Sequence, residues 1–259
     1  MADVSLTNVM QPAQVSKLVA QALQSNEAVA VAEKPGSIIE RWPVKTGQDP
    51  GAASLTLDVA DTTVSELGAF ARPSQWTSID TDPPVALQTT RVAPAETTVW
   101  RVKVKIVGLR LESDGDYHLE LQDSTGAMMI AEIPLPKPQY IGNNNRLAPL
   151  IAAARTAADN QFQKTVKEAQ LAQSTTSNKL VPASAVIQRN GVAAVAPVQG
   201  LDLAAMTADP STLQTFAMSI APVDATITGI GFFDKYHGQA GNAPNIIELH
   251  PVLDLQFGS

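Results

Sequence analysis

The chain has 259 residues, of which 44% are hydrophobic and 17% are charged, and it contains no cysteine. This apolar fraction excludes a wholly disordered protein, and the lack of cysteine excludes a disulfide scaffold, a thiolate zinc site and a cysteine nucleophile. The 18 basic and 25 acidic residues give a net charge of −7, which argues against a protein that binds nucleic acid with its whole surface.

The N-terminal sequence lacks the basic start and the apolar run of a secretory signal. No apolar stretch approaches the ~20 residues that a helix needs to span a bilayer. We therefore expect synthesis in the cytoplasm, no signal peptide and no membrane partner.

Residues 1–96 are predicted to form an N-terminal arm with short helices. Apolar residues recur at helical spacing over residues 12–27, behind an early proline. Seven prolines interrupt residues 34–96, within which Thr63 and Glu66 have the spacing of a capping box. Because an unsupported loop of this length is improbable in a compact domain, the arm is expected to lie on this chain or on neighbouring subunits.

Residues 97–257 are predicted to form the folded domain. Five segments combine apolar residues with strand-like alternation or turn signals at their ends. The turn between the first two contains Asp-Gly, which favours a tight hairpin. The predicted strands are residues 99–111, 117–122, 128–133, 225–233 and 246–257.

A helix and a long insertion separate the third and fourth strands. Apolar residues trace one stripe over residues 146–172, and asparagines precede this segment as capping candidates. Residues 173–215 carry four charged residues and no aromatic residue, yet contain many apolar ones. This composition predicts an insertion that is docked on a surface rather than free in water.

The order strand-strand-strand-helix-strand-strand is that of the OB fold, a five-stranded Greek-key barrel. An α+β sandwich could be built from the same elements. The barrel is favoured because the first strand is long and carries Gly108 near its middle, where a barrel strand must bend. We expect a mainly β protein with some α: an OB-like barrel with an N-terminal helical arm and a long insertion before its fourth strand.

Several motifs resemble those of an uncharacterised bacterial family of OB-like proteins. They are DGDYHLELQD at residues 114–123, MIAEIP at 129–134, TGIGFFD at 228–234, HGQ at 237–239 and IELHPV at 247–252, with WPVKTG at 42–47 as a lead-in. The resemblance covers most of residues 38–257 and implies a fold rather than an activity. Residues 12–27 and 173–215 look like additions to the family pattern.

All three histidines lie in these motifs. His118 shares one strand face with Glu120, and Glu248 shares one with His250, while His237 lies in a loop. His118, His237, Glu248 and His250 are therefore candidate ligands of a divalent metal ion, or groups for acid–base catalysis. The alternative is that each histidine makes a hydrogen bond that fixes a barrel corner or loop.

Three aspartates bracket the first hairpin, and their carboxylates could suggest a calcium site. Asp114, Asp116 and Asp123 lack the spacing of an EF-hand loop. Since Asp-Gly is common in tight turns, we interpret them as turn residues.

Basic residues form a stripe on one face of the first predicted strand. Arg101, Lys103 and Lys105 alternate there with apolar residues. OB barrels commonly bind single-stranded nucleic acid through a basic groove with stacking aromatic residues. The acidic net charge and the 5% aromatic content favour a solvated strand face instead.

We therefore expect a non-enzymatic assembly or binding subunit whose extensions contact proteins, as a homo-oligomer or part of a larger assembly, without a cofactor. One alternative is a barrel that binds single-stranded nucleic acid. The other is a metal-dependent hydrolase or nuclease-like enzyme. A fold alone does not decide between them.

Overall fold

The computed structural model describes residues 40–112, 114–175, 184–189, 192–197 and 215–258. The helix expected over residues 12–27 lies outside the described residues. The other expected elements can be compared with the structure directly.

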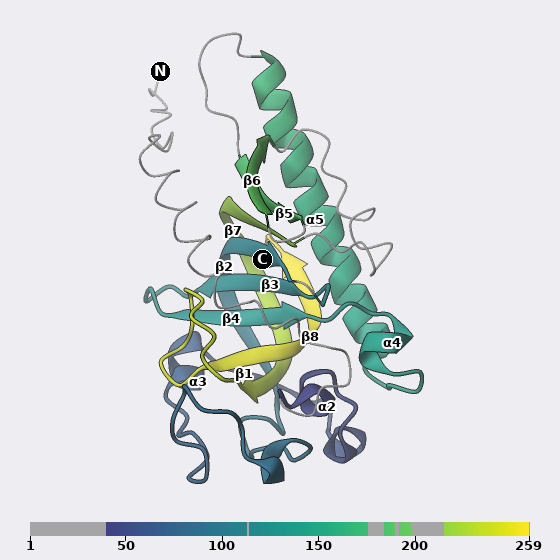
Figure 1. Ribbon diagram of the computed structural model, residues 1–259, viewed down its shortest axis with the longest axis vertical. Helices are drawn as coiled ribbons and strands as arrows, with labels where there is room; N and C mark the ends of the chain where they lie inside the picture. Colours follow the sequence, from purple (N-terminus) through teal and green to yellow (C-terminus); the bar gives the residue numbers. More distant parts are fainter. Residues whose placement is uncertain (1–39, 113, 176–183, 190–191, 198–214, 259) are drawn as a thin grey trace.

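Five strands close into a barrel (Figure 1). Around it they follow the order β2, β3, β4, β8, β7 and back to β2. The pairing of β4 with β8 is parallel, and the other four pairings are antiparallel. This closed mixed barrel is consistent with the expected OB-like barrel. Its strands are β2 (Val99–Leu111), β3 (Tyr117–Gln122), β4 (Met128–Ile133), β7 (Thr215–Phe233) and β8 (Ile247–Phe257).

The first barrel strand bends where the sequence predicts. The pairing of β2 with both β3 and β7 shifts register between Ile106 and Gly108. A β-carbon at Gly108 would collide with the carboxyl group of Glu120 on the paired strand. A glycine therefore permits the bulge and the close approach of the two strands.

The first half of the long helix α5 (Ala148–Thr175) packs Ile151, Ala154, Ala158 and Phe162 against the barrel. Asn145 Oδ1 accepts a hydrogen bond from the Leu147 amide at 2.9 Å, just before the helix starts. Phe162 is fully buried, with edge-to-face contacts to Tyr117 and Phe257 at centroid distances of 6.3 and 6.0 Å. No helix within the described ranges, α5 included, has both the length and the hydropathy that a bilayer span requires.

Residues 40–96 pack against the barrel of their own chain, below it in Figure 1. The expected capping box is present, because the Thr63 hydroxyl accepts a hydrogen bond from the Glu66 amide and Glu66 accepts one from the Thr63 amide. The short elements outside the barrel are α2 (Trp42–Lys45), η1 (Pro50–Ser54), β1 (Val59–Asp61), α3 (Val64–Gly68), η2 (Val85–Leu87) and α4 (Pro138–Ile141).

Buried apolar residues of this arm join the barrel core. Leu55, Leu67, Trp76 and Leu87 are at most 6% exposed and belong to the same apolar cluster as the barrel interior. Of the two placements that the sequence allowed for the arm, residues 40–96 adopt the intramolecular one.

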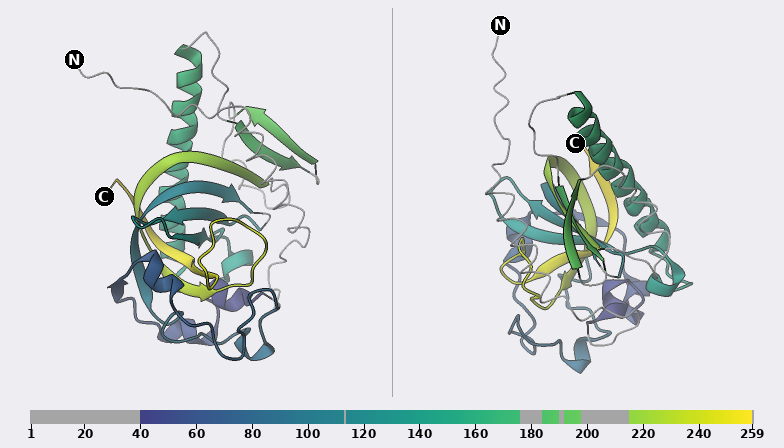
Figure 2. Two further views of the ribbon diagram at one scale, coloured as in Figure 1. Left: turned by 90° about the vertical axis from the view of Figure 1, so that its left-hand side faces the viewer. Right: turned by 45° about the horizontal axis from the view of Figure 1, so that its top comes forward.

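The insertion contains regular structure that the sequence analysis did not predict. Strands β5 (Ser184–Arg189) and β6 (Val192–Pro197) form an antiparallel hairpin, and β5 pairs with β7. β7 begins at Thr215, well before the expected residue 225, and its first part pairs with the end of β2 on one side and with β5 on the other. Figure 2 shows this hairpin standing away from the barrel, on the side toward which α5 also projects.

Candidate functional site

A group of buried ionisable side chains lies on the outer face of the barrel, beneath α2. Alternation along each strand places it opposite to the apolar residues that fill the interior. No member exposes more than 7% of its surface. We call this group the histidine–carboxylate cluster; its members are Asp116, His118, Glu132 and His250, with Lys45 of α2 above them.

Glu132 is the centre of the histidine–carboxylate cluster. One carboxylate oxygen, Oε1, lies 2.9 Å from His118 Nδ1 across the β3–β4 pairing. The other, Oε2, lies 2.9 Å from His250 Nδ1 and 3.7 Å from Lys45 Nζ. A single carboxylate therefore ties two barrel strands and the N-terminal arm to β4.

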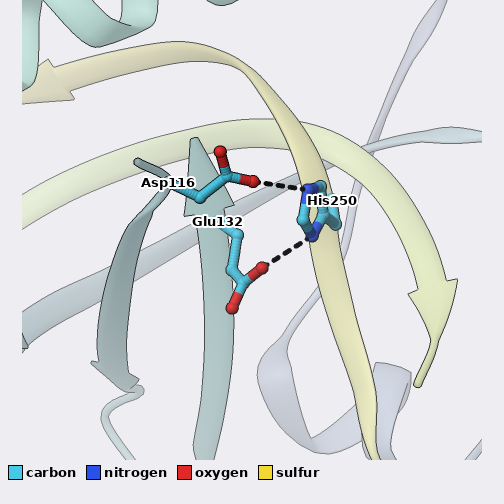
Figure 3. Close-up of side chains that lie close together, drawn as sticks. All are labelled: Asp116, Glu132 and His250. Atoms are coloured by element: carbon cyan, nitrogen blue, oxygen red, sulfur yellow. Dashed lines mark ion pairs between the residues drawn. The ribbon is translucent and has the colours of Figure 1, made fainter. Parts of the chain in front are cut away.

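His250 lies between two carboxylates (Figure 3). Its Nδ1 faces Glu132, and its Nε2 faces Oδ2 of Asp116 at 3.6 Å. The other Asp116 oxygen, Oδ1, accepts a hydrogen bond from the Leu135 amide at 2.8 Å, which fixes the carboxyl group. Asp116, Glu132 and His250 each offer one ligating atom within 4.8 Å of the other two.

The electrostatics of the histidine–carboxylate cluster favour a negative Glu132 and a cationic partner. Burial raises the pKa of Glu132, but Lys45 and the two histidines outweigh it and hold this pKa well below its usual value. Burial lowers the pKa of His250, whereas the neighbouring Asp116 and Glu132 raise it by a larger amount. Carboxylates on both sides of the ring therefore attract positive charge to this position.

His237 and Glu248, the other two predicted ligands, are placed differently. His237 Nε2 lies 3.5 Å from Oδ2 of Asp234, in the loop between β7 and β8. Burial raises the pKa of Asp234, but Lys45 and His237 outweigh it and hold this pKa below its usual value. Glu248 is buried on β8, two residues before His250.

The sequence analysis therefore identified part of this site. It named both histidines of the cluster and placed Glu120 on the same strand face as His118, but the carboxylate that contacts His118 is Glu132 of the neighbouring strand. Asp114 and Asp123 act in turns, accepting backbone hydrogen bonds two residues ahead. Asp116 was also assigned to the turn, and its second oxygen instead faces His250.

Two contributors to the site were missed altogether. Glu132 is the one charged residue in the apolar strand β4, and this could have marked it as a residue with a buried partner. Lys45 carried no such signal, because its partner is 87 positions away in the sequence. Its place in the site depends on how the arm folds back over the barrel.

Two residues of the predicted basic stripe, Arg101 and Lys103, line a separate hollow of about 850 Å³. Arg101 forms an ion pair with Asp61 at 2.6 Å, and Lys105 forms one with Asp224 at 2.7 Å. The Arg101 guanidinium holds the pKa of Asp61 below its usual value, and the charge of Lys103 acts in the same direction. The charged groups that line the hollow are the cations Arg101 and Lys103 and the carboxylates Asp61, Asp123 and Asp254.

The two sites differ in what they can bind. The hollow is open and carries charges of both signs, so it lacks the positive field that attracts a phosphate backbone. The histidine–carboxylate cluster is closed to solvent, which suits a proton or a metal ion better than a polymeric substrate. No family model, curated protein or solved structure matches the chain. The resemblance to a bacterial OB-like family therefore remains a prediction.

Proposed function

We propose that this protein is a non-enzymatic assembly subunit that pairs with a second copy of itself through the free edge of strand β6. The barrel serves as a rigid scaffold, and the β5–β6 hairpin carries the contact. The position and composition of β6 are the observations on which this proposal rests.

Strand β6 ends the eight-stranded sheet. Among the described residues it pairs only with β5, and no described strand pairs with its other edge. Natural edge strands are usually protected by lysine, by other charges or by proline. β6 reads Val-Ala-Ala-Val-Ala-Pro, with no charge and with proline only at its last position.

An unprotected edge of this kind favours pairing with an identical strand. Two β6 strands related by a twofold axis can pair in antiparallel orientation, which is a self-complementary contact. The hairpin stands away from the barrel (Figure 2), so the barrel does not obstruct a second copy. The charge-poor composition of residues 173–215 is also suited to burial at such a contact.

The geometry supports the two alternatives less well. OB barrels commonly bind oligonucleotides on the outer face of their second and third strands, and here Lys45 of the chain's own arm lies against that face. Two cations of the basic stripe already form ion pairs within the chain: Arg101 with Asp61 and Lys105 with Asp224. The histidine–carboxylate cluster is buried, which does not suit hydrolysis of a large substrate.

Size-exclusion chromatography with light scattering tests the proposal on the full chain. We expect the wild type to have twice the 27.3 kDa mass of one chain. The variant Ala193→Lys/Ala194→Lys places two positive charges on the edge strand of each copy and should yield monomers.

The matched control is Val85→Lys, because Val85 is 90% exposed in the arm and lies outside the hairpin. This variant should keep the wild-type mass. A wild type that is monomeric at every concentration, or a lysine variant that remains a dimer, would show that β6 does not mediate assembly.

A further inference from the structure

We propose that Asp116 and His250 bind a divalent metal ion, Zn²⁺ in the first instance, between Oδ2 of the aspartate and Nε2 of the histidine. This site is independent of the assembly contact at β6. Of the ligand set predicted from the sequence it keeps His250, adds Asp116, and leaves out His118, His237 and Glu248.

The two ligating atoms face each other without a hydrogen bond. Asp116 Oδ2 and His250 Nε2 are both buried and have no hydrogen-bond partner. Their separation of 3.6 Å is too long for a hydrogen bond. Two buried polar atoms that remain unsatisfied and point at each other are costly unless a charged species lies between them.

The separation agrees with two ligands of one metal ion. Zn²⁺ binds imidazole nitrogen and carboxylate oxygen at about 2.0–2.2 Å with tetrahedral angles, so two such ligands lie about 3.4 Å apart. The observed 3.6 Å is close to this value. An ion can therefore be accommodated with only small movements of the two side chains.

Glu132 supplies the support that metal-binding histidines usually have. In most sites the second ring nitrogen donates to a carboxylate, which fixes the tautomer and the orientation of the ring. Here Nδ1 of His250 forms an ion pair with Oε2 of Glu132 at 2.9 Å, although the angle is not that of a hydrogen bond, and Nε2 is the nitrogen that faces Asp116. Asp116 is fixed in the same way, because its Oδ1 accepts the hydrogen bond from Leu135.

The burial of the two ligands would slow the exchange of a bound ion with solvent. Asp116 and His250 are 1% and 0% exposed, and α2 covers the site through Lys45. His118, held by the same Glu132, places a second buried imidazole beside that carboxylate. An ion at this position would link the β2–β3 turn to β8, and its binding would be coupled to folding.

Isothermal titration with ZnSO₄ and absorption spectra with CoCl₂ test the site on the full chain, after removal of metal by a chelator. We expect one ion per chain. Asp116→Asn, which keeps the oxygen that Leu135 contacts, should abolish binding, as should His250→Gln. Glu132→Gln should weaken binding about 10–100-fold by releasing the ring.

His237→Gln is the matched control, because this histidine pairs with Asp234 outside the proposed ligand pair and should leave binding unchanged. Circular dichroism identifies any variant that fails to fold. If a variant fails to fold, long-range ¹H–¹⁵N spectra of the wild-type histidines test the site instead. Addition of Zn²⁺ should shift the ¹⁵N resonance of His250 Nε2. Absence of stoichiometric binding, equal binding by Asp116→Asn, or an unchanged His250 Nε2 signal would overturn the proposal.

Discussion

Arg41 and Glu96 form a bidentate ion pair in which both side chains are fully buried, with N–O distances of 2.6 and 2.7 Å. The remaining donors of Arg41 reach the carbonyl oxygens of Leu87, Thr90 and Phe233. Glu96 in turn accepts hydrogen bonds from two backbone amides, one of them that of Phe233 on β7. The pair thus fastens the start of the described arm to the barrel.

Breaking this pair is expected to destabilise the protein strongly. Glu96→Ala leaves a buried guanidinium without its carboxylate, and such changes cost about 3–5 kcal/mol of unfolding free energy. Urea denaturation of the variant and the wild type measures the difference. In the matched control, Asp82→Ala removes the exposed partner of Lys235 and should cost less than about 1 kcal/mol. Similar losses in the two variants would mean that the buried pair does not hold the arm.

Gly231 is expected to tolerate no side chain. A β-carbon there would collide with the carbonyl oxygen of Ala95, which is backbone and cannot rotate away. Gly231→Ala should lower the unfolding free energy by about 3 kcal/mol. Gly126→Ala is the comparison. A β-carbon at Gly126 would meet no other atom, so only the positive φ of 88° opposes the change, and the loss of unfolding free energy should be about 1 kcal/mol. Thermal unfolding followed by circular dichroism distinguishes the two.

Phe162 is expected to anchor α5 to the barrel. Its ring is fully buried between Tyr117 and Phe257, so Phe162→Ala removes these contacts and leaves a cavity. The loss should be about 3–5 kcal/mol in guanidinium denaturation. Val85→Ala, at a position that is 90% exposed, should change stability by less than about 0.5 kcal/mol. A small effect at Phe162 would show that the helix is held elsewhere.

The β3–β4 turn is expected to weaken in acid. Burial raises the pKa of Asp123, but hydrogen bonds from Thr125, Ala127 and Ser65 lower it by a larger amount. The pKa therefore lies below its ordinary value of 3.8. A carboxylate with a lowered folded-state pKa contributes stability above its unfolded pKa, and this contribution is lost as the pH falls through the folded value. The unfolding free energy of the wild type relative to Asp123→Asn should therefore be constant near neutral pH and fall below about pH 4. Urea unfolding at a series of pH values measures it, and a difference that does not change with pH would contradict the assignment.

Much of the barrel could be predicted from local sequence patterns. The bounds of β2 and β3 match the prediction because alternation of apolar and polar residues has a period of two within a single strand, and those of β4 match because a turn precedes it and a proline follows it. The capping box at Thr63 and Glu66 was predictable for a similar reason, since both partners lie within one helical turn. The β5–β6 hairpin was not predicted, because its small apolar residues carry no alternation.

The candidate site could be predicted only in part. His118 and His250 were named because histidines are few and lie in distinctive motifs. Their common carboxylate was not named, because Glu132 reaches His250 only after β4 and β8 become neighbours in the closed barrel. Residues more than a hundred positions apart leave no periodic signal in a single sequence.

The sequence by itself determined where the barrel strands lie and that a helix interrupts them, since these features follow from local periodicity and turn chemistry. Only the tertiary structure decided that the arm covers its own barrel, that Asp116 turns one oxygen toward His250, and that β6 ends the sheet. Each of these depends on long-range burial, where the cost of removing a charge from water is offset only by a partner that the closed fold brings to it.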